Sequence, residues 1–351
     1  MDLSIAAILT QDGITSGAIY ALLALALVLV FSVTRVIFIP QGEFVAFGAL
    51  TLAAMQSNKF PHSATMLVAL GVATFVVESF AIMRTAERRR TAARSVPIAL
   101  AKFIVFPVAV YLCARSLNGS NLPMLLQVVL TLAIVAPMGP MIYRLAFQPL
   151  AEATTLVLLI VSVGVHFALL GIGLVMFGAE GSRTTPFSDA RFEVGALAIT
   201  GQSLVIVGVS VWLILALYLY FERTLSGKAL RATAVNRLGA RLVGIGTTQA
   251  GRLAFTLAAV MGALCGVLIA PLTTVYYDSG FLIGLKGFVG AIIGGLGSYP
   301  IAAGGALLVG LLESFSSFWA SAFKEVIVFT LIIPVLLWRS LKSRHVDEGE
   351  E

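Results

Sequence analysis

Long apolar stretches recur along the whole chain, and they constrain its fold more than any other feature. A helix needs about 20 mostly apolar residues, with a range of roughly 17–25, to cross a bilayer. Eleven segments are candidates for membrane helices: 14–34, 43–58, 64–83, 96–114, 122–142, 154–178, 202–221, 251–271, 284–298, 301–319 and 324–341. The short segments 43–58 and 284–298 are expected to be tilted, broken or re-entrant.

Composition supports a bilayer environment. Hydrophobic residues make up 59% of the chain and charged residues only 11%, against about 25% charged in a typical soluble domain. This excludes a soluble enzyme, a disordered chain and a nucleic-acid-binding module. The apolar runs are continuous and lack the period-two alternation of membrane β-barrel strands. The expected fold is therefore an all-α polytopic membrane protein, one domain over 1–351 with about 9–11 transmembrane or half-membrane helices.

Basic residues predict the orientation, because cytoplasmic loops carry an excess of Lys and Arg. The loops 84–94 and 222–241 and the C-terminal tail concentrate them, and placing all three in the cytoplasm puts 16 of the 23 basic residues on that side. Eleven crossings then place the N-terminus outside and the C-terminus in the cytoplasm. Lys286 and Lys324 fall near the outer face in this scheme. Asp2 and the lack of an N-terminal basic cluster favour a first membrane helix over a cleaved leader.

The longest cytoplasmic loop, about 222–250, carries a helical pattern. Ala229, Ala232, Val235 and Leu238 or Gly239 recur at intervals of three to four, with arginines between them. This spacing predicts a short amphipathic helix at the inner membrane surface. The pattern leaves two interpretations open, a basic loop resting on anionic lipid and a docking helix for a cytoplasmic partner. The outer loop, about 179–199, mixes both signs of charge and is expected to form a small extracytoplasmic cap.

Motifs for catalysis and nucleotide binding are missing from the sequence. Gly227-Lys228 lacks the upstream glycine of a phosphate-binding loop and is followed by Ala229. The three histidines are scattered and form no metal-binding pattern. We therefore expect no enzymatic activity, no cofactor and no metal site in this chain.

Carboxylates inside apolar segments are functional candidates, because ionisable groups are costly in the bilayer. Gln41 and Glu43 follow Pro40, where a half-helix is expected to begin with Glu43 near its positive end. They fit either a translocation-path element or an ordinary interfacial carboxylate. Glu78 is expected to pair with an arginine. Glu313, beside several serines, is expected to face the bundle or a water-lined path, and Lys324 and Glu325 are expected to form an interfacial pair.

Glycines predict where helices pack closely, because small residues let helix backbones approach in lipid. Gly262 and Gly266 form one such pair. A denser block surrounds 298–300 and predicts a broken, tightly packed hairpin of the kind that builds transport sites. Its members are Gly290, Gly294, Gly295, Gly297, Gly304 and Gly305.

Three stretches together resemble one family of membrane proteins. They read GAIYALLALALVLVFSVTRVIFIPQGEFVAFGAL (17–50), SGKALRATAVNRLGARLVGI (226–245) and FVGAIIGGLGSYPIAAGGALLVGLLES (288–314). They are similar to the inner-membrane permeases of binding-protein-dependent ABC importers, specifically the branched-chain amino-acid permeases of the LivH type. The resemblance covers most of 10–58 and nearly all of 143–341.

The resemblance implies a multi-pass subunit of a bacterial inner membrane that forms half of a translocation pathway and works by alternating access. Its implied partners are a second, homologous permease, two cytoplasmic ATP-binding subunits and an extracytoplasmic solute-binding protein, with membrane lipid around it and no nucleic acid. It also implies that the loop 222–250 docks the ATPase. The residues carried over to this role are Gly227, Lys228, Ala229, Arg231, Asn236, Arg237, Ala240 and Gly244.

The sequence departs from the family in two places. The family often carries Asn-Phe-Ala-His-Gly-Glu after the first helix, whereas this chain has Phe38-Ile39-Pro40-Gln41-Gly42-Glu43, which keeps only the Gly-Glu pair. This puts the substrate in doubt, and urea or short amides remain alternatives to hydrophobic amino acids. Residues 60–121 resemble an insertion of two helices. Two rivals from other classes are an ion-gradient-driven secondary transporter, which needs paired midplane carboxylates or a Na⁺ site, and an intramembrane enzyme, which needs a nucleophile and a base.

Overall fold

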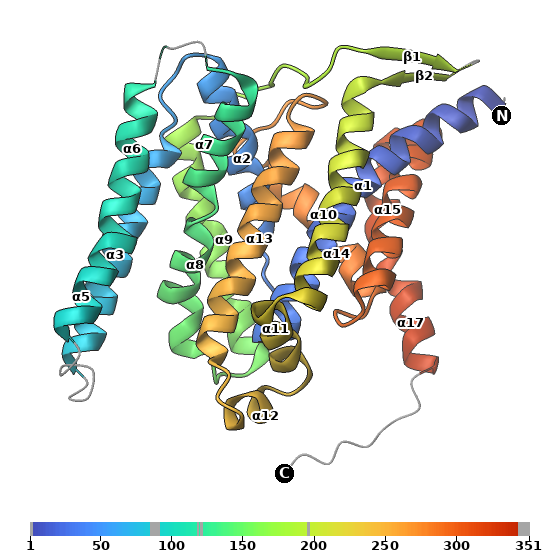
Figure 1. Ribbon diagram of the computed structural model, residues 1–351. Helices are drawn as coiled ribbons and strands as arrows, with labels where there is room; N and C mark the ends of the chain where they lie inside the picture. Colours follow the sequence, from blue (N-terminus) through green and yellow to red (C-terminus); the bar gives the residue numbers. More distant parts are fainter. Residues whose placement is uncertain (1–2, 85–91, 118, 120–121, 195–196, 343–351) are drawn as a thin grey trace.

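The computed structural model describes residues 3–84, 92–117, 119, 122–194 and 197–342. Within them the chain is a bundle of helices (Figure 1), and eight helices are long and apolar enough to cross a membrane. These spans are Ser4–Thr34, Ser63–Arg84, Ser95–Ser116, Met124–Leu150, Thr155–Phe177, Gly201–Arg223, Thr247–Ile269 and Tyr299–Trp319. Shorter helices complete the bundle, so the all-α polytopic prediction is confirmed.

A break separates the first two helices, and the second begins where the sequence predicts a half-helix. α1 (Leu3–Thr34) ends before Arg35, whose φ of 62° lies in the left-handed region. An irregular segment then leads to α2 (Gln41–Gln56), which begins directly after Pro40. Backbone groups at a helix break in the membrane need partners, and the amide of Ile39 donates to Ser162 Oγ at 3.0 Å. The bundle therefore satisfies this break from within.

The segments expected at 64–83 and 96–114 form a hairpin at one edge of the bundle (Figure 1). α3 (Ser63–Arg84) packs on a helix composed of α5 (Ala92–Leu100), a π-helical turn η1 (Ala101–Val105) and α6 (Phe106–Ser116). Pro107 cannot donate an ordinary helical hydrogen bond, and the π turn accommodates it just upstream. That residues 60–121 are an insertion stays a prediction.

Glu78 ties this hairpin to the centre of the bundle. Its carboxylate Oε2 accepts from Arg144 Nε at 2.5 Å and lies 3.6 Å from Arg252 Nη2. The expected arginine partner of Glu78 is thereby confirmed. Arg144 lies in the π turn η2 (Tyr143–Phe147) and is buried rather than placed in a loop.

The crossing expected at 122–142 extends to residue 150. It consists of α7 (Met124–Val135), α8 (Met138–Ile142), η2 and the 3₁₀ turn η3 (Gln148–Leu150). Pro137 and Pro140 interrupt the α-helical hydrogen bonds without ending the span. The sequence boundary was wrong because the buried Arg144 interrupts the apolar run that defined it.

A strand pair lies at the end of the bundle that carries the N-terminus of α1 (Figure 1). After α9 (Thr155–Phe177), β1 (Arg191–Val194) pairs antiparallel with β2 (Leu197–Thr200), with Arg191 opposite Thr200. α10 (Gly201–Arg223) follows directly. The predicted small cap at 179–199 thus contains a β-hairpin.

Two short helices replace the single one expected at 222–250. They are α11 (Leu225–Val235) and α12 (Arg237–Leu242), separated at Asn236 and followed by α13 (Thr247–Ile269). Asn236 starts the second helix, because its Oδ1 accepts from the amide of Gly239 at 2.8 Å. Asparagine is a preferred first residue of a helix, so the break has a local cause.

The last helices confirm the predicted hairpin but shift its first arm. α14 spans Ser279–Ile293 rather than 284–298, and α15 spans Tyr299–Trp319. Gly295 and Leu296 have φ of 66° and 57°, which turns the chain sharply and ends α14 early. The segment expected at 324–341 divides at Leu331, just before Pro334, into α16 (Lys324–Thr330) and α17 (Ile332–Lys342), preceded by the 3₁₀ turn η4 (Ser321–Phe323).

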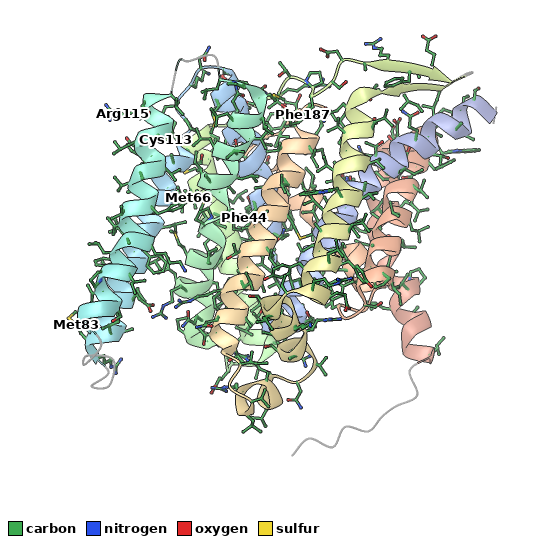
Figure 2. The ribbon with its side chains drawn as sticks, in the orientation of Figure 1. Phe44, Met66, Met83, Cys113, Arg115 and Phe187 are labelled. Carbon is green, nitrogen blue, oxygen red and sulfur yellow. The ribbon has the colours of Figure 1, made fainter. Side chains whose placement is uncertain are left out.

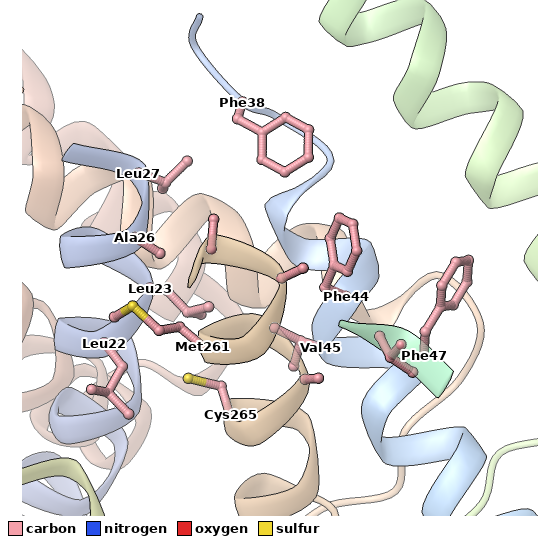
Figure 3. Packing of buried hydrophobic residues seen from close by; sticks show 14 of the residues in the cluster. Leu22, Leu23, Ala26, Leu27, Phe38, Phe44, Val45, Phe47, Met261 and Cys265 are labelled. Atoms are coloured by element: carbon pink, nitrogen blue, oxygen red, sulfur yellow. The ribbon is translucent and has the colours of Figure 1, made fainter. Parts of the chain in front are cut away.

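The core lies where α1, α2 and α13 meet. Figure 3 shows Met261 and Cys265 of α13 between Leu23 of α1 and Val45 of α2. Above them Phe38, in the segment between α1 and α2, contacts the rings of Phe44, Phe147 and Phe255. The close approach depends on the predicted small pair, because a Cβ on Gly266 would lie 2.0 Å from the carbonyl oxygen of Val45.

The two ends of the bundle differ in the way that the basic residues predict. Met83, at the end of α3, lies at the end that carries α11 and α12, whereas Arg115 and Phe187 lie at the opposite end (Figure 2). α17 also runs toward the α12 end (Figure 1). The expected cytoplasmic segments therefore share one end within the described residues.

Candidate functional site

Gln41 and Glu43 lie in the interior of the bundle, in the first turn of α2, and both side chains are buried. Gln41 Nε2 donates to the carbonyl of Ala258 at 2.9 Å, and Ala258 is the central residue of α13. His166 Nδ1 lies 2.9 Å from Glu43 Oε1, and His166 is the central residue of α9. Since both helices are long enough to span a membrane, α2 begins near mid-depth.

Phe281 completes this group of residues, which we call the midplane cluster (Gln41, Glu43, His166 and Phe281). Its ring stacks on the imidazole of His166 with centroids 4.6 Å apart. Phe281 lies in the first turn of α14, so two helix N-termini meet at the cluster. Their contact requires glycine, because a Cβ on Gly42 would lie 2.1 Å from the carbonyl oxygen of Gly280.

The midplane cluster contains unused hydrogen-bonding capacity. Within the part of the chain that the structure describes, Gln41 Oε1 and Glu43 Oε2 accept no hydrogen bond. Buried polar atoms are usually paired, and unpaired ones call for an explanation. Both atoms are acceptors, so the cluster is suited to a ligand that brings N–H donors.

Glu313 belongs to a separate group, the Glu313 cluster (Tyr20, Lys286, Glu313 and Glu325). Its carboxylate accepts from Lys286 Nζ at 2.5 Å and from the hydroxyl of Tyr20 at 2.6 Å. Lys286 also lies 3.7 Å from Glu325 Oε1. The structure thus places Glu313 facing the bundle, as expected, but does not bring it together with Gln41 and Glu43.

Two expectations about these residues were wrong. Lys286 is buried at the centre of α14 rather than near the outer face, because α14 begins five residues earlier than its apolar run suggests. Glu325 faces Lys286 rather than its neighbour Lys324. Residues adjacent in a helix point in different directions, so Lys324 cannot share the direction of Glu325.

A polar recess of about 400 Å³ opens beside Glu313. It lies between α1 and α15, and its polar lining is formed by Asp12, Ser16, Glu313, Ser314 and Ser317. The exposed sides of α3 and α9 are apolar by comparison, with residues such as Val76 and Ile160. A polar surface within membrane helices normally faces protein or water.

The α11–α12 segment is anchored by the arginines expected to dock a partner. Arg231 Nη1 donates to Glu222 at 2.6 Å, and Arg237 Nη1 donates to the carbonyl of Ala151 at 2.8 Å. Arg241 donates to Glu152 at 3.0 Å. These contacts hold the two helices against the ends of α10 and α9, so the guanidinium groups have internal roles.

The α11–α12 segment buries one set of residues and exposes another. Leu230, Thr233 and Ala240 are buried, whereas Val235 is 86% exposed and Leu238 is 67% exposed. Of the predicted apolar stripe, Val235 and Leu238 therefore face away from the bundle, and whether lipid or a partner covers them stays a prediction. Lys228 and Gly244 are also exposed.

Gly227, one residue of the expected docking set, lies at a close contact between two helices. A Cβ there would lie 2.2 Å from the carbonyl oxygen of Tyr220, so α11 folds back tightly on α10. Ala229 and Ala232 are half-buried beside it.

The glycine block at 290–305 divides into contact and turn positions. Gly290, Gly294 and Gly305 lie where α14 and α15 touch, since a Cβ on each would come within 2.6–2.7 Å of the facing helix. Gly295 supplies a turn with positive φ. Gly304 has open space around it, and Gly297 has only a distant neighbour at 3.8 Å, so neither belongs to the expected packing surface.

Sequence reasoning missed His166, Lys286 and Tyr20 as site residues. His166 is one of the scattered histidines that form no motif, although a single histidine at the centre of a long apolar run is a signal in itself. Tyr20 carried no such signal. Among the described residues, no group of three or more His, Cys, Asp or Glu side chains could hold a metal ion.

Comparison with known proteins identifies relatives of the chain and the family to which it belongs. It is 28% identical to the high-affinity branched-chain amino acid transport system permease protein LivH of Salmonella typhimurium, over 68% of this chain and 80% of that protein. It is 30% identical to LivH of Escherichia coli K12, over 59% of this chain and 69% of the relative, and 28% identical to BraD of Pseudomonas aeruginosa, over 68% and 80%. No solved structure matches the chain. The model of the family described as the permease component of branched-chain amino acid transport systems matches residues 9–336, so the chain belongs to this permease family.

Proposed function

We propose that the chain is a transmembrane subunit of an ABC importer and forms half of a pathway for branched-chain amino acids. The observation that carries this proposal is the family match over residues 9–336. The names of the relatives, each a high-affinity branched-chain amino acid permease, supply the substrate class. The discontinuous helices that meet near mid-depth support it, because such breaks commonly build transport sites.

The proposed path includes Gln41, Glu43 and Glu313. Gln41 and Glu43 offer buried acceptors at the meeting point of α2 and α14, and Glu313 lies at the wall of the polar recess. Transport would follow alternating access, in which ATP binding favours one global state and the substrate binds the two states with different affinity.

The proposed partners are two cytoplasmic ATP-binding subunits, a second permease subunit and an extracytoplasmic solute-binding protein. The α11–α12 segment is the proposed ATPase contact, because it presents Val235, Leu238 and Leu242 as exposed apolar residues at the end richest in Lys and Arg. In the proposed orientation the C-terminus lies on the cytoplasmic side of a bacterial inner membrane. The β-hairpin end would then face the binding protein.

The rivals differ in one structural requirement. A secondary transporter needs paired carboxylates at mid-depth or a Na⁺ site. Within the described residues Glu43, Glu78 and Glu313 lie in separate clusters, each beside a histidine, arginine or lysine, which disfavours the first of these. Urea or short amides remain the alternative substrates for an importer, since Gln41 and Glu43 would accept amide N–H groups as well.

The test is uptake by cells that lack other branched-chain amino acid transport and express the chain with its genomic partners. We expect uptake of leucine, isoleucine and valine that requires an active ATPase subunit and persists with a protonophore while ATP is maintained. Uptake without the ATPases would support a gradient-driven transporter. Uptake of urea in place of amino acids would overturn the substrate assignment.

A further inference from the structure

A cavity of about 230 Å³ lies directly beside Gln41. It is bounded by α1, by the irregular segment before α2, by α9 and by α14, with Leu27, Ile37, Leu159, Leu285 and Phe288 among its walls. No charged side chain lines it, and Gln41 is the polar side chain in its wall. The cavity is therefore an apolar chamber with one polar corner, near mid-depth in the bundle.

Gln41 at this corner also carries an acceptor that is unpaired within the described residues and enclosed by the protein. The amide nitrogen of Gln41 is committed to the carbonyl of Ala258, which fixes the orientation of the side chain. Its Oε1 accepts nothing from the described residues, and only 1% of the residue is exposed. An acceptor enclosed in this way is costly unless a ligand supplies a donor.

We propose that this cavity is the subsite that receives the aliphatic side chain of a neutral amino acid during transport, with the polar end of the amino acid at the edge of the cavity formed by Gln41. The inference rests on the proposed function and specifies the ligand of the same region. The polar end of the substrate would lie at the start of α2, close to Glu43, and the side chain would extend toward Leu159, Leu285 and Phe288.

The apolar residues that line the cavity favour an aliphatic side chain as its occupant. A charged or strongly polar side chain would lose its hydration without gaining partners there. The volume is below the range of about 300–1,000 Å³ that is typical for drug-sized ligands, which fits a small solute. Gly284 keeps one wall flat and close to α2, because a Cβ there would lie 2.8 Å from Gly42 Cα.

Filling the cavity tests the proposal. Leu159→Phe inserts a ring at the wall, and the matched control Leu156→Phe makes the same change on the same helix at a residue that is 67% exposed. Uptake of leucine and valine is measured with the complete importer and one binding protein, so the ratio between substrates reports changes in the permease. We expect Leu159→Phe to lower the leucine-to-valine uptake ratio roughly tenfold, the scale of a one-methylene discrimination, and Leu156→Phe to leave it unchanged.

Enlarging the cavity gives an independent test that does not depend on the first variant folding. Leu285→Ala removes side-chain volume from the α14 wall. We expect it to raise uptake of a larger substrate, phenylalanine or methionine, relative to leucine. Copurification with the ATPase subunits identifies the variants that assemble.

The outcomes separate this inference from the proposed function. If the wild-type importer carries leucine and valine but assembled Leu159→Phe and Leu285→Ala both keep the wild-type ratios, the cavity is not the subsite and the proposed function stands. A cavity that only holds a lipid chain gives this same result. If the wild-type importer carries neither amino acid, the proposed function itself fails.

Discussion

Lys286, Tyr20 and Glu313 show how single residues hold charge inside this bundle. The lysine is buried at the centre of α14, and its ammonium group meets the Glu313 carboxylate while the tyrosine hydroxyl bonds the second carboxylate oxygen. Removing one member of a buried ion pair leaves the other charge uncompensated, which costs about 3–5 kcal/mol.

The first prediction follows from this pairing. Lys286→Met and Glu313→Gln should each lower the thermal stability of the detergent-purified protein. The double variant should be more stable than the sum of the two losses implies, because both charges of the pair are removed together and only the partly exposed Glu325 keeps its charge. Thermal unfolding followed by fluorescence-detected size exclusion measures the cycle. Additive losses would show that the two side chains are not energetically coupled.

Glu43→Gln tests the midplane cluster. The substitution keeps the size of the side chain but replaces the carboxyl group that faces His166 and the start of α14 with an amide. We expect assembly with partners to be preserved and branched-chain amino acid uptake to fall at least roughly tenfold, the loss expected for about 1.4 kcal/mol of interaction with the transported species. Glu193→Gln, on the exposed β-hairpin, is the matched control. Full uptake by Glu43→Gln would return Glu43 to a structural role.

Residues near each other in sequence were more predictable than their partners. Pro40 and Gly42 indicated that a half-helix would begin close to Glu43, because both effects are local, and α2 begins at Gln41. His166 and Ser162 lie more than a hundred positions away, and no local pattern places them beside Glu43 and Ile39. Residue-level identification of the site therefore needs the tertiary arrangement.

At the scale of helices, the apolar runs predicted which segments are helical better than they predicted where each helix begins and ends. Each of the eleven expected segments contains helix, but α14 begins and ends five residues earlier than its run. The cause is specific, because Gly295 and Leu296 adopt positive φ and reverse the chain inside an apolar stretch. An apolar run indicates that a segment is buried in lipid or protein. The residue at which a helix ends depends instead on the backbone conformation of the turn that follows.

The next prediction concerns the close contact between α2 and α14. Gly42→Ala places a methyl group against the Gly280 carbonyl, so α14 must move away from α2 and the midplane cluster must open. Overpacking of this kind costs about 1–3 kcal/mol, and we expect lower thermal stability together with lower uptake. The control is Gly164→Ala on α9, where a Cβ meets nothing within 4 Å. Equal behaviour of the two variants would contradict a tight contact.

The α11–α12 segment supplies a second prediction at this scale. Leu238→Ser removes an exposed apolar side chain from α12 without touching the anchoring arginines, so the permease should fold normally but copurify with less ATPase. Phe192→Ser on β1 makes a similar loss at the opposite end and should leave copurification unchanged. Arg237→Glu should act differently, by detaching α12 from Ala151 and lowering stability as well. Wild-type ATPase binding by Leu238→Ser would argue against docking through this face.

For the whole molecule, the basic residues predicted which helix ends lie together. Successive membrane helices alternate in direction, so every second connection lies at the same end of the bundle, and α17 runs toward the end that carries α11 and α12 (Figure 1). The chain's lateral faces were not predictable from composition. Apolar residues cover the exposed sides of α3 and α9, while α1 and α15 present the polar recess.

The polar recess leads to the last prediction. Lipid chains cannot pair with Asp12, Ser16 and Ser317, so this face of a permease should be covered by its second transmembrane subunit or by the water of a shared path. A photo-crosslinking amino acid at Ser317 should therefore capture the second permease in the assembled importer. The same probe at Val76, on the exposed apolar side of α3, should yield only lipid adducts. Capture from Val76 with none from Ser317 would move the subunit interface to the peripheral hairpin, and the recess would then need water rather than protein to solvate it.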